Sequence, residues 1–352
     1  EGMGETGAKA VRVSTVLFFL SACAGYAILM AQQVNSLVSR VTDIGHRVAV
    51  MIVAPALFSL AMLRDVGAIA RLMPVATVAG VISCAIIIFE SLVDAKHWQI
   101  WPQEEKDKVH CMMLPPGATF MTLASICASI GGAFSCIPAV PGIVSEMARP
   151  HEFPKAWIGM IVTTFSLYMA VMVLGHYGWG NFVQDSIVDS MVYNPGSPQE
   201  AFGPQARDPK SWTGPRSTRF SPVLMSLFVL VNLTLSYPLL MMIVIVSVQS
   251  TTFGQSRLPV GTLPNYFMRA AMVGFTIFIA LLTESFLNVF SLVSSIFGPL
   301  MNVFFIFIFG RRIQERFKII YPSWRRGCHV LICLFGAFCL VFGFIDSVMA
   351  FL

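Results

Sequence analysis

The chain has 352 residues, of which 56% are hydrophobic and only 12% are charged, with a formal net charge of +5. A soluble domain carries roughly twice that share of charged residues, so the composition excludes an ordinary soluble domain. The charged residues collect between long apolar runs, which predicts an all-α polytopic membrane protein embedded in a lipid bilayer.

Apolar runs predict a single transmembrane domain over residues 1–352, with about nine helices. The predicted spans are 12–34, 48–64, 70–91, 118–143, 156–178, 222–249, 267–283, 286–309 and 328–350. Two long connections, residues 92–117 and 180–221, are expected to be external loops, and the second is rich in Pro, Gly and Ser.

The loop charges predict the orientation. One set of segments holds fourteen bases and six acids, a net charge of +8, whereas the rest of the chain has a net charge of −3. The positive-inside rule places the basic set in the cytosol and explains the overall basicity without a nucleic-acid partner. The basic set is 1–12, 64–71, 146–155, 250–269 and 310–326.

The fourth predicted span contains helix-breaking residues inside the membrane, where unpaired backbone groups are energetically costly. Pro138, Pro141 and Gly142 interrupt it, and Ser135 and Cys136 add small polar groups. Unpaired backbone survives in a membrane only where protein or a water-filled cavity covers it, and transporters use such breaks to bind substrates. We expect a broken helix over 133–142 at a binding site; a plain proline kink is the alternative.

Polar residues near helix breakers also occur in three other spans, which predicts that these spans line one cavity. The alternative for a single Ser or Thr is a hydrogen bond to the carbonyl one turn earlier, and the alternative for the clusters together is hydrogen bonding between helices. The residues are Tyr26, Gln32 and Gln33 in the first span; Asn232, Thr234, Ser236 and Tyr237 in the sixth; and Ser291, Ser294, Ser295 and Asn302 in the eighth.

Titratable groups give no sign of an enzyme. Glu90, Glu284 and Asp346 fall near span ends, where we expect water to reach them, and His176 is the best candidate to titrate near neutral pH. No H-E-x-x-H, G-x-S-x-G or P-loop pattern occurs, so no catalytic residue, metal or cofactor is predicted. The eight cysteines suggest no structural disulfide.

The broken span and its successor resemble the amino acid/auxin permease family of the APC superfamily. The segment "FSCIPAVPGIVSEMARPHEFPKAW" and the following "LYMAVMVLGHYGWGN" carry the resemblance, and "LTLSYPLL" is similar to the family's eighth helix. The family's Gly-His pair in the sixth helix is replaced here by Cys136–Ile137 or Ile137–Pro138. The positions in register are Pro141, Ile143, Met147, Pro150, Phe153, Pro154, Tyr168, Gly175, Tyr177, Trp179 and Gly180.

The resemblance implies a LeuT-like inverted-repeat transporter fold with helices 3–11 present and helices 1–2 missing. The chain would then be an incomplete permease that does not transport alone. The family's function is secondary active transport of amino acids by alternating access, more often coupled to H⁺ than to Na⁺. The alternatives are a non-transporting amino-acid sensor and a vestigial membrane protein with the permease fold.

By the same resemblance, the broken helix and two neighbouring helices would bind the amino acid substrate. A hydroxyl of the eighth helix, on Thr234 or Ser236, would hold sodium if the carrier used it. The expected location is the plasma membrane or a vacuolar or lysosomal membrane. The substrate-facing residues implied are Tyr26, Phe134, Ser135, Cys136, Ile137, Asn232, Thr234 and Ser236.

Overall fold

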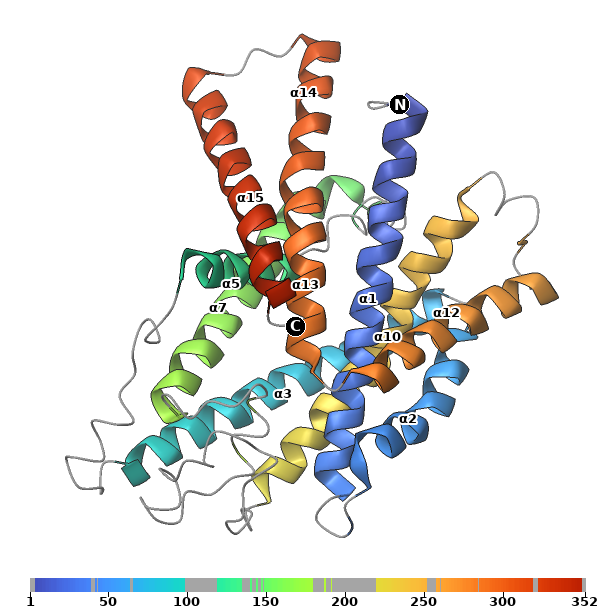
Figure 1. The fold of residues 1–352 in the computed structure, drawn as a ribbon, viewed down its shortest axis with the longest axis vertical. Coiled ribbons are helices and arrows are strands. Elements are labelled where there is room, and N and C mark those ends of the chain that lie inside the picture. The colour runs from blue at the N-terminus through green and yellow to red at the C-terminus, as the bar shows by residue number, and fades with distance from the viewer. Residues whose placement is uncertain are drawn as a thin grey trace.

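Every element in the described part of the chain is a helix (Figure 1). The helices are α1 Gly4–Val38, α2 Gly45–Ala61, α3 Val66–Trp98, α5 Phe120–Ala133, α7 Phe153–Trp179, α10 Ser221–Gln249, α12 Leu263–Leu282, α13 Phe286–Pro299, α14 Phe305–Phe317 and α15 Ser323–Met349, with a 3-10 turn η2 Pro150–Glu152 and a π-helical turn η5 Leu300–Phe304. This computed structural model describes residues 4–38, 42, 44–63, 66–98, 119–134, 140, 144, 147, 149–179, 187, 191, 220–251, 258–259, 261–283, 285–318 and 322–349.

The helices agree with a polytopic membrane protein. Seven helical stretches in the described residues are long and apolar enough to cross a membrane, while α2 and α5 are shorter at 17 and 14 residues. Some helices continue past the predicted spans, because a helix satisfies its own backbone in water as well as in lipid. The eighth span was expected to end at 309, yet α14 runs to Phe317 and is supported there by an Arg311–Glu315 ion pair of 3.1 Å.

The longest helix, α1, is the centre of the bundle and contacts α2, α10, α12 and α13 (Figure 1). Small side chains on α1 make close approach possible: Ala24, Ala27 and Ala31 are all fully buried. On α10, Tyr237 is also fully buried and exchanges a hydrogen bond of 3.0 Å with Thr276 of α12. The core therefore joins segments that are far apart in the sequence.

Helices α2 and α12 run antiparallel and are joined at both ends. Near the start of α2, the His46 Nε2 atom lies 2.9 Å from the Ala280 carbonyl oxygen, near the end of α12. At the other end, Arg269 near the start of α12 donates to the carbonyls of Ala61 and Leu63, at 3.1 and 2.9 Å. These links fix the relative direction of the two helices.

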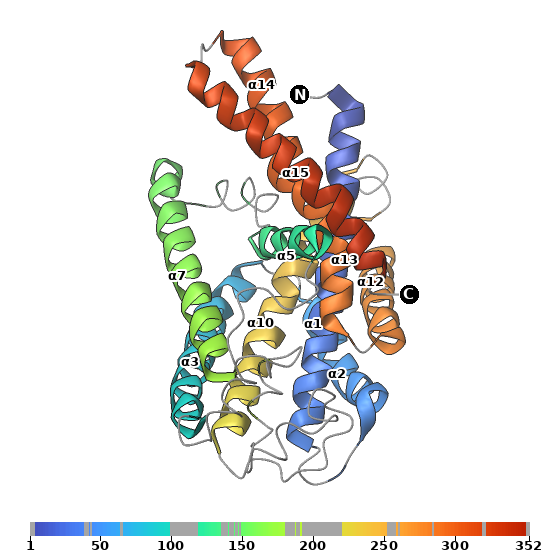
Figure 2. The ribbon, with the colours of Figure 1, turned by 60° about the vertical axis from the view of Figure 1, so that its left-hand side comes forward.

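The remaining helices lie beside this core. Helix α7 contacts α3, while α5 crosses the molecule at mid-height and contacts α13 and α15 (Figure 2). The π-helical turn η5 follows Pro299, which cannot donate a helical hydrogen bond, and it joins α13 to α14.

Candidate functional site

The candidate site begins where α5 ends. This helix starts at the cap residue Thr119, whose hydroxyl accepts from the Thr122 amide at 3.2 Å, and it ends at Ala133 with Phe134 as its C-cap. Fourteen residues give a helix of about 21 Å, shorter than the roughly 30 Å of a bilayer's hydrocarbon core. The helix thus stops at the start of the predicted break, 133–142. Within that break, 135–139 and 141–142 lie outside the described residues.

Glycines allow α5 to pack closely against its neighbours. A methyl group at Gly298 of α13 would lie 3.4 Å from the Ala128 carbonyl oxygen, and one at Gly343 of α15 would lie 3.2 Å from the Ala124 carbonyl oxygen. A methyl at Gly132 would overlap the Ser294 hydroxyl. The backbone of α5 therefore touches both neighbouring helices directly, which requires residues without a Cβ at these points.

Four serine hydroxyls connect the same three helices. Ser291 of α13 lies 2.9 Å from Ser125 of α5 and 2.7 Å from Ser347 of α15, measured between Oγ atoms. Ser295 lies 3.1 Å from Ser347 and donates to the Ser291 carbonyl at 2.7 Å. The sequence indicated Ser291 and Ser295 but missed Ser125 and Ser347, because a serine in an apolar helix does not reveal which helix it faces.

Two aromatic residues link the end of α5 to its surroundings. The rings of Phe134 and Tyr168, on α7, have centroids 5.5 Å apart and are inclined at 55°. Phe134 was predicted to face the substrate, and it contacts Tyr168, a residue that the family motif contains but that was not assigned to the site.

The predicted residues on α10 point in different directions. Thr234 donates to the Met30 sulfur of α1 at 3.6 Å. Because Met30 lies one helical turn after Tyr26, Thr234 contacts the same face of α1 that carries Tyr26. Asn232 instead faces α3 and donates to the Ala76 carbonyl at 2.7 Å. Residues two positions apart in a helix point about 200° apart, which explains the divergence. Ser236 is half-buried.

Of the eight predicted substrate-facing residues, Ser135, Cys136 and Ile137 lie outside the described part of the chain. The five others are Tyr26 on α1, Phe134 at the end of α5, and Asn232, Thr234 and Ser236 on α10. Phe134 contacts Tyr168 and Thr234 donates to Met30, whereas Asn232 is bonded to α3.

Two charged residues, Glu90 and Arg269, are buried although the sequence predicted that water would reach them. Glu90 was expected to reach water, but only 6% of its surface is exposed, because α3 continues to Trp98 and places it within the helix. Asp346 is half-buried and accepts from the Thr122 hydroxyl at 3.4 Å. Arg269 was counted among loop bases, yet it is 1% exposed within α12. Glu284 lies outside the described residues.

No group of three or more His, Cys, Asp or Glu side chains that could hold a metal ion comes together in the described residues. What the helices form is a bundle in which α5 ends at Ala133, packs on α13 and α15 through serine hydroxyls, and contacts Tyr168 of α7 through Phe134.

The comparison with family models identifies the chain more narrowly. A model described as "Transmembrane amino acid transporter protein" matches residues 1–197 and 200–349, so the chain belongs to this family of multi-pass amino acid transporters. The resemblance found in the sequence is confirmed. Comparisons with curated proteins and with solved structures found no match.

Proposed function

We propose that the chain is the membrane domain of a secondary active amino acid carrier whose substrate binds at the break after α5. The single observation that carries this proposal is the end of α5 at Ala133, short of a complete crossing. The last carbonyls of a helix have no partner within that helix, and the ammonium group of a zwitterionic amino acid can donate to such carbonyls. Tyr26, Phe134 and Thr234 would form the wall around the substrate.

The proposed fold is the LeuT type, with five helices related to the next five by a two-fold axis in the membrane plane. In this scheme α1, α2 and α3 correspond to α10, α12 and α13. Two pairs of helix contacts support it: α1 contacts α12 as α10 contacts α2, and α1 contacts α13 as α10 contacts α3. The antiparallel course of α2 and α12 agrees with an inverted repeat.

Alternating access would move α5 relative to α13 and α15. The serine hydroxyls that join these helices can exchange partners without leaving a polar group unpaired, whereas an apolar contact offers no such set of alternatives. The glycine contacts at Gly298 and Gly343 leave no side chain that would have to be displaced when the backbones slide.

Proton coupling is the preferred mode, and Glu90 is the proposed proton carrier. A carboxylate inside a membrane span is costly unless it serves a function, and Glu90 is 6% exposed within the apolar stretch 71–93. It lies beside Ser91, whose backbone packs directly on Gly178 of α7.

The test is uptake of radiolabelled amino acids by proteoliposomes that contain the full-length product of the gene. An inwardly directed proton gradient is expected to drive accumulation, and Glu90→Gln is expected to remove the gradient dependence while exchange continues. Asp346→Asn is the matched control, because it removes a partly buried carboxylate from a different helix. Accumulation that follows a sodium gradient instead would refute proton coupling.

The sensor alternative has its own outcome in this experiment. Amino acids would raise the thermal stability of the purified protein while no flux appeared under either gradient. If no amino acid changed the stability and none was transported, the proposed substrate site would be wrong.

A further inference from the structure

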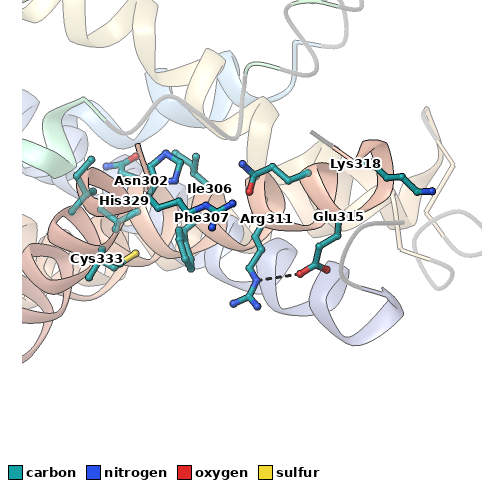
Figure 3. A pocket seen from close by; sticks show the side chains of 14 residues that line it. Asn302, Ile306, Phe307, Arg311, Glu315, Lys318, His329 and Cys333 are labelled. Carbon is teal, nitrogen blue, oxygen red and sulfur yellow. Dashed lines mark hydrogen bonds and ion pairs between the residues drawn. The ribbon is translucent and has the colours of Figure 1, made fainter. Parts of the chain in front are cut away.

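A cavity lies between α14 and α15 (Figure 3). Its volume is about 900 Å³. The two helices diverge toward their connection (Figure 1), and the π-helical turn η5 at the base of α14 sets the direction of that helix. Gly310 lines the cavity, and a methyl group added there would meet no atom within 4 Å, so the cavity is unobstructed beside this residue.

The cavity is apolar at its base and basic toward its mouth. Val303, Ile306 and Val330 contribute the apolar part. Arg311, Lys318 and Arg326 contribute three permanent positive charges against the single carboxylate of Glu315, which gives the lining a net charge of +2 with histidine neutral. Glu315 is paired with Arg311 at 3.1 Å (Figure 3). An anion that enters the mouth therefore meets uncompensated positive charge.

The cavity adjoins surface that suits a lipid. Large apolar side chains on α14 and α15 are exposed beside it: Ile306 by 42%, Val330 by 55% and Ile332 by 50%. In a chain that spans a bilayer, such surface faces hydrocarbon, so the cavity is reached sideways from the membrane. The loop between α14 and α15 belongs to the basic set predicted to be cytosolic, which puts the mouth at the level of the inner-leaflet headgroups.

We propose that α14 and α15 bind one anionic glycerophospholipid of the cytosolic leaflet. Its phosphate is held by Arg311 and Arg326, and one acyl chain follows Val303, Ile306 and Val330. Basic pockets between membrane helices on the cytoplasmic side are suited to such headgroups, and planar guanidinium groups match a phosphate bidentately. A soluble anion would not use the apolar base, and a neutral lipid would not use the arginines. This site is independent of the proposed amino acid site.

Two cysteines on α15 allow a direct test. Cys333 lines the cavity and is half-buried, whereas Cys328 is exposed and does not line it. The protein would be placed in nanodiscs of phosphatidylcholine, with or without phosphatidylglycerol, and the rate of maleimide labelling of each cysteine would be measured by peptide mass spectrometry. Phosphatidylglycerol is expected to slow labelling of Cys333 several-fold and leave Cys328 unchanged.

Charge-removing variants show whether the effect belongs to this cavity. Each basic residue near the membrane surface contributes about 1 kcal/mol toward anionic lipid, so Arg311→Gln with Arg326→Gln is expected to weaken phosphatidylglycerol binding roughly 30-fold and to abolish the protection of Cys333. The matched control is Arg312→Gln with Arg325→Gln, which removes the same charge from neighbouring positions that do not line the cavity. The targeted arginines are exposed, so both variants are expected to fold, and gel filtration checks this.

Three results would overturn the proposal. Equal loss of protection in both double variants would mean that diffuse surface charge attracts the lipid. Equal protection by glycerol phosphate alone would identify a soluble anion as the occupant. Unchanged labelling of Cys333 in phosphatidylglycerol would mean that no lipid enters, and native mass spectrometry would then find no retained phosphatidylglycerol.

Discussion

Replacement of Arg269 by methionine is expected to destabilise the bundle although it removes a charge from the interior. The guanidinium is 1% exposed and donates to three oxygens: the carbonyls of Ala61 and Leu63, and the side chain of Asn265 at 2.9 Å. The two carbonyls end α2, so the arginine also lies at the negative end of that helix dipole. Methionine fills a similar volume but donates to none of these groups.

The magnitude follows from opposing terms. Hydrogen bonds to a charged donor contribute about 1.5–3 kcal/mol each, so the two carbonyl bonds amount to roughly 3–6 kcal/mol. The favourable dipole contact adds about 0.3–2 kcal/mol. Burial of the guanidinium opposes these gains by several kcal/mol, which methionine does not incur. We expect a net loss of about 2–4 kcal/mol, and a smaller one for Arg269→Lys, whose ammonium can donate to the carbonyls but lacks the separate Nε–H that donates to Asn265.

The assay is thermal unfolding of the detergent-purified protein, followed by loss of the monodisperse gel-filtration peak. At about 2 °C per kcal/mol, Arg269→Met should lower the apparent midpoint by roughly 4–8 °C. Arg149→Met is the control, because Arg149 forms an exposed ion pair of 3.3 Å with Glu152, and such pairs contribute about 0–1 kcal/mol. If both variants had the same midpoint, the arginine would not be holding α2 to α12, and the reasoning would fail.

Three further predictions concern α5, α15 and α10. Gly132→Val is expected to lower the free energy of unfolding by about 1–3 kcal/mol, because the new side chain overlaps α13. Gly131→Val points into open space and should leave thermal stability nearly unchanged, so equal losses in the two variants would contradict the packing. Ser347→Ala removes a hydroxyl that contacts three others and should cost about 1–2 kcal/mol in the same unfolding assay, and an unchanged midpoint would argue against the serine cluster. Asn232→Leu should lower thermal stability with little change in the KM of uptake. Thr234→Val should raise the KM of uptake at nearly constant stability. The reverse result would mean that Asn232 contacts the substrate and that Thr234 holds the helices together.

Long apolar runs and the family motifs are local features, and from them the amino-acid order predicted the class and the family of the protein correctly. Helix α5 ends at Ala133, but 135–139 and 141–142 lie outside the described residues, so the break over 133–142 stays a prediction. That prediction rests on Pro138 and Pro141, because proline removes backbone donors regardless of tertiary context.

The amino-acid sequence could not predict in the same way which side chains contact one another. Arg269 seemed a loop base, and only the antiparallel contact of α12 with α2 makes it a buried cap for two carbonyls. Asn232 and Thr234 seemed equivalent, and the neighbours of α10 separate them, one bonded to α3 and the other to α1. Apolar residues surround α1 and α10 on nearly all sides, so hydrophobic periodicity does not show which neighbour a given face of these two helices contacts. The close fit of glycine and serine contacts between helices decides the arrangement, and those contacts exist only once the bundle is assembled.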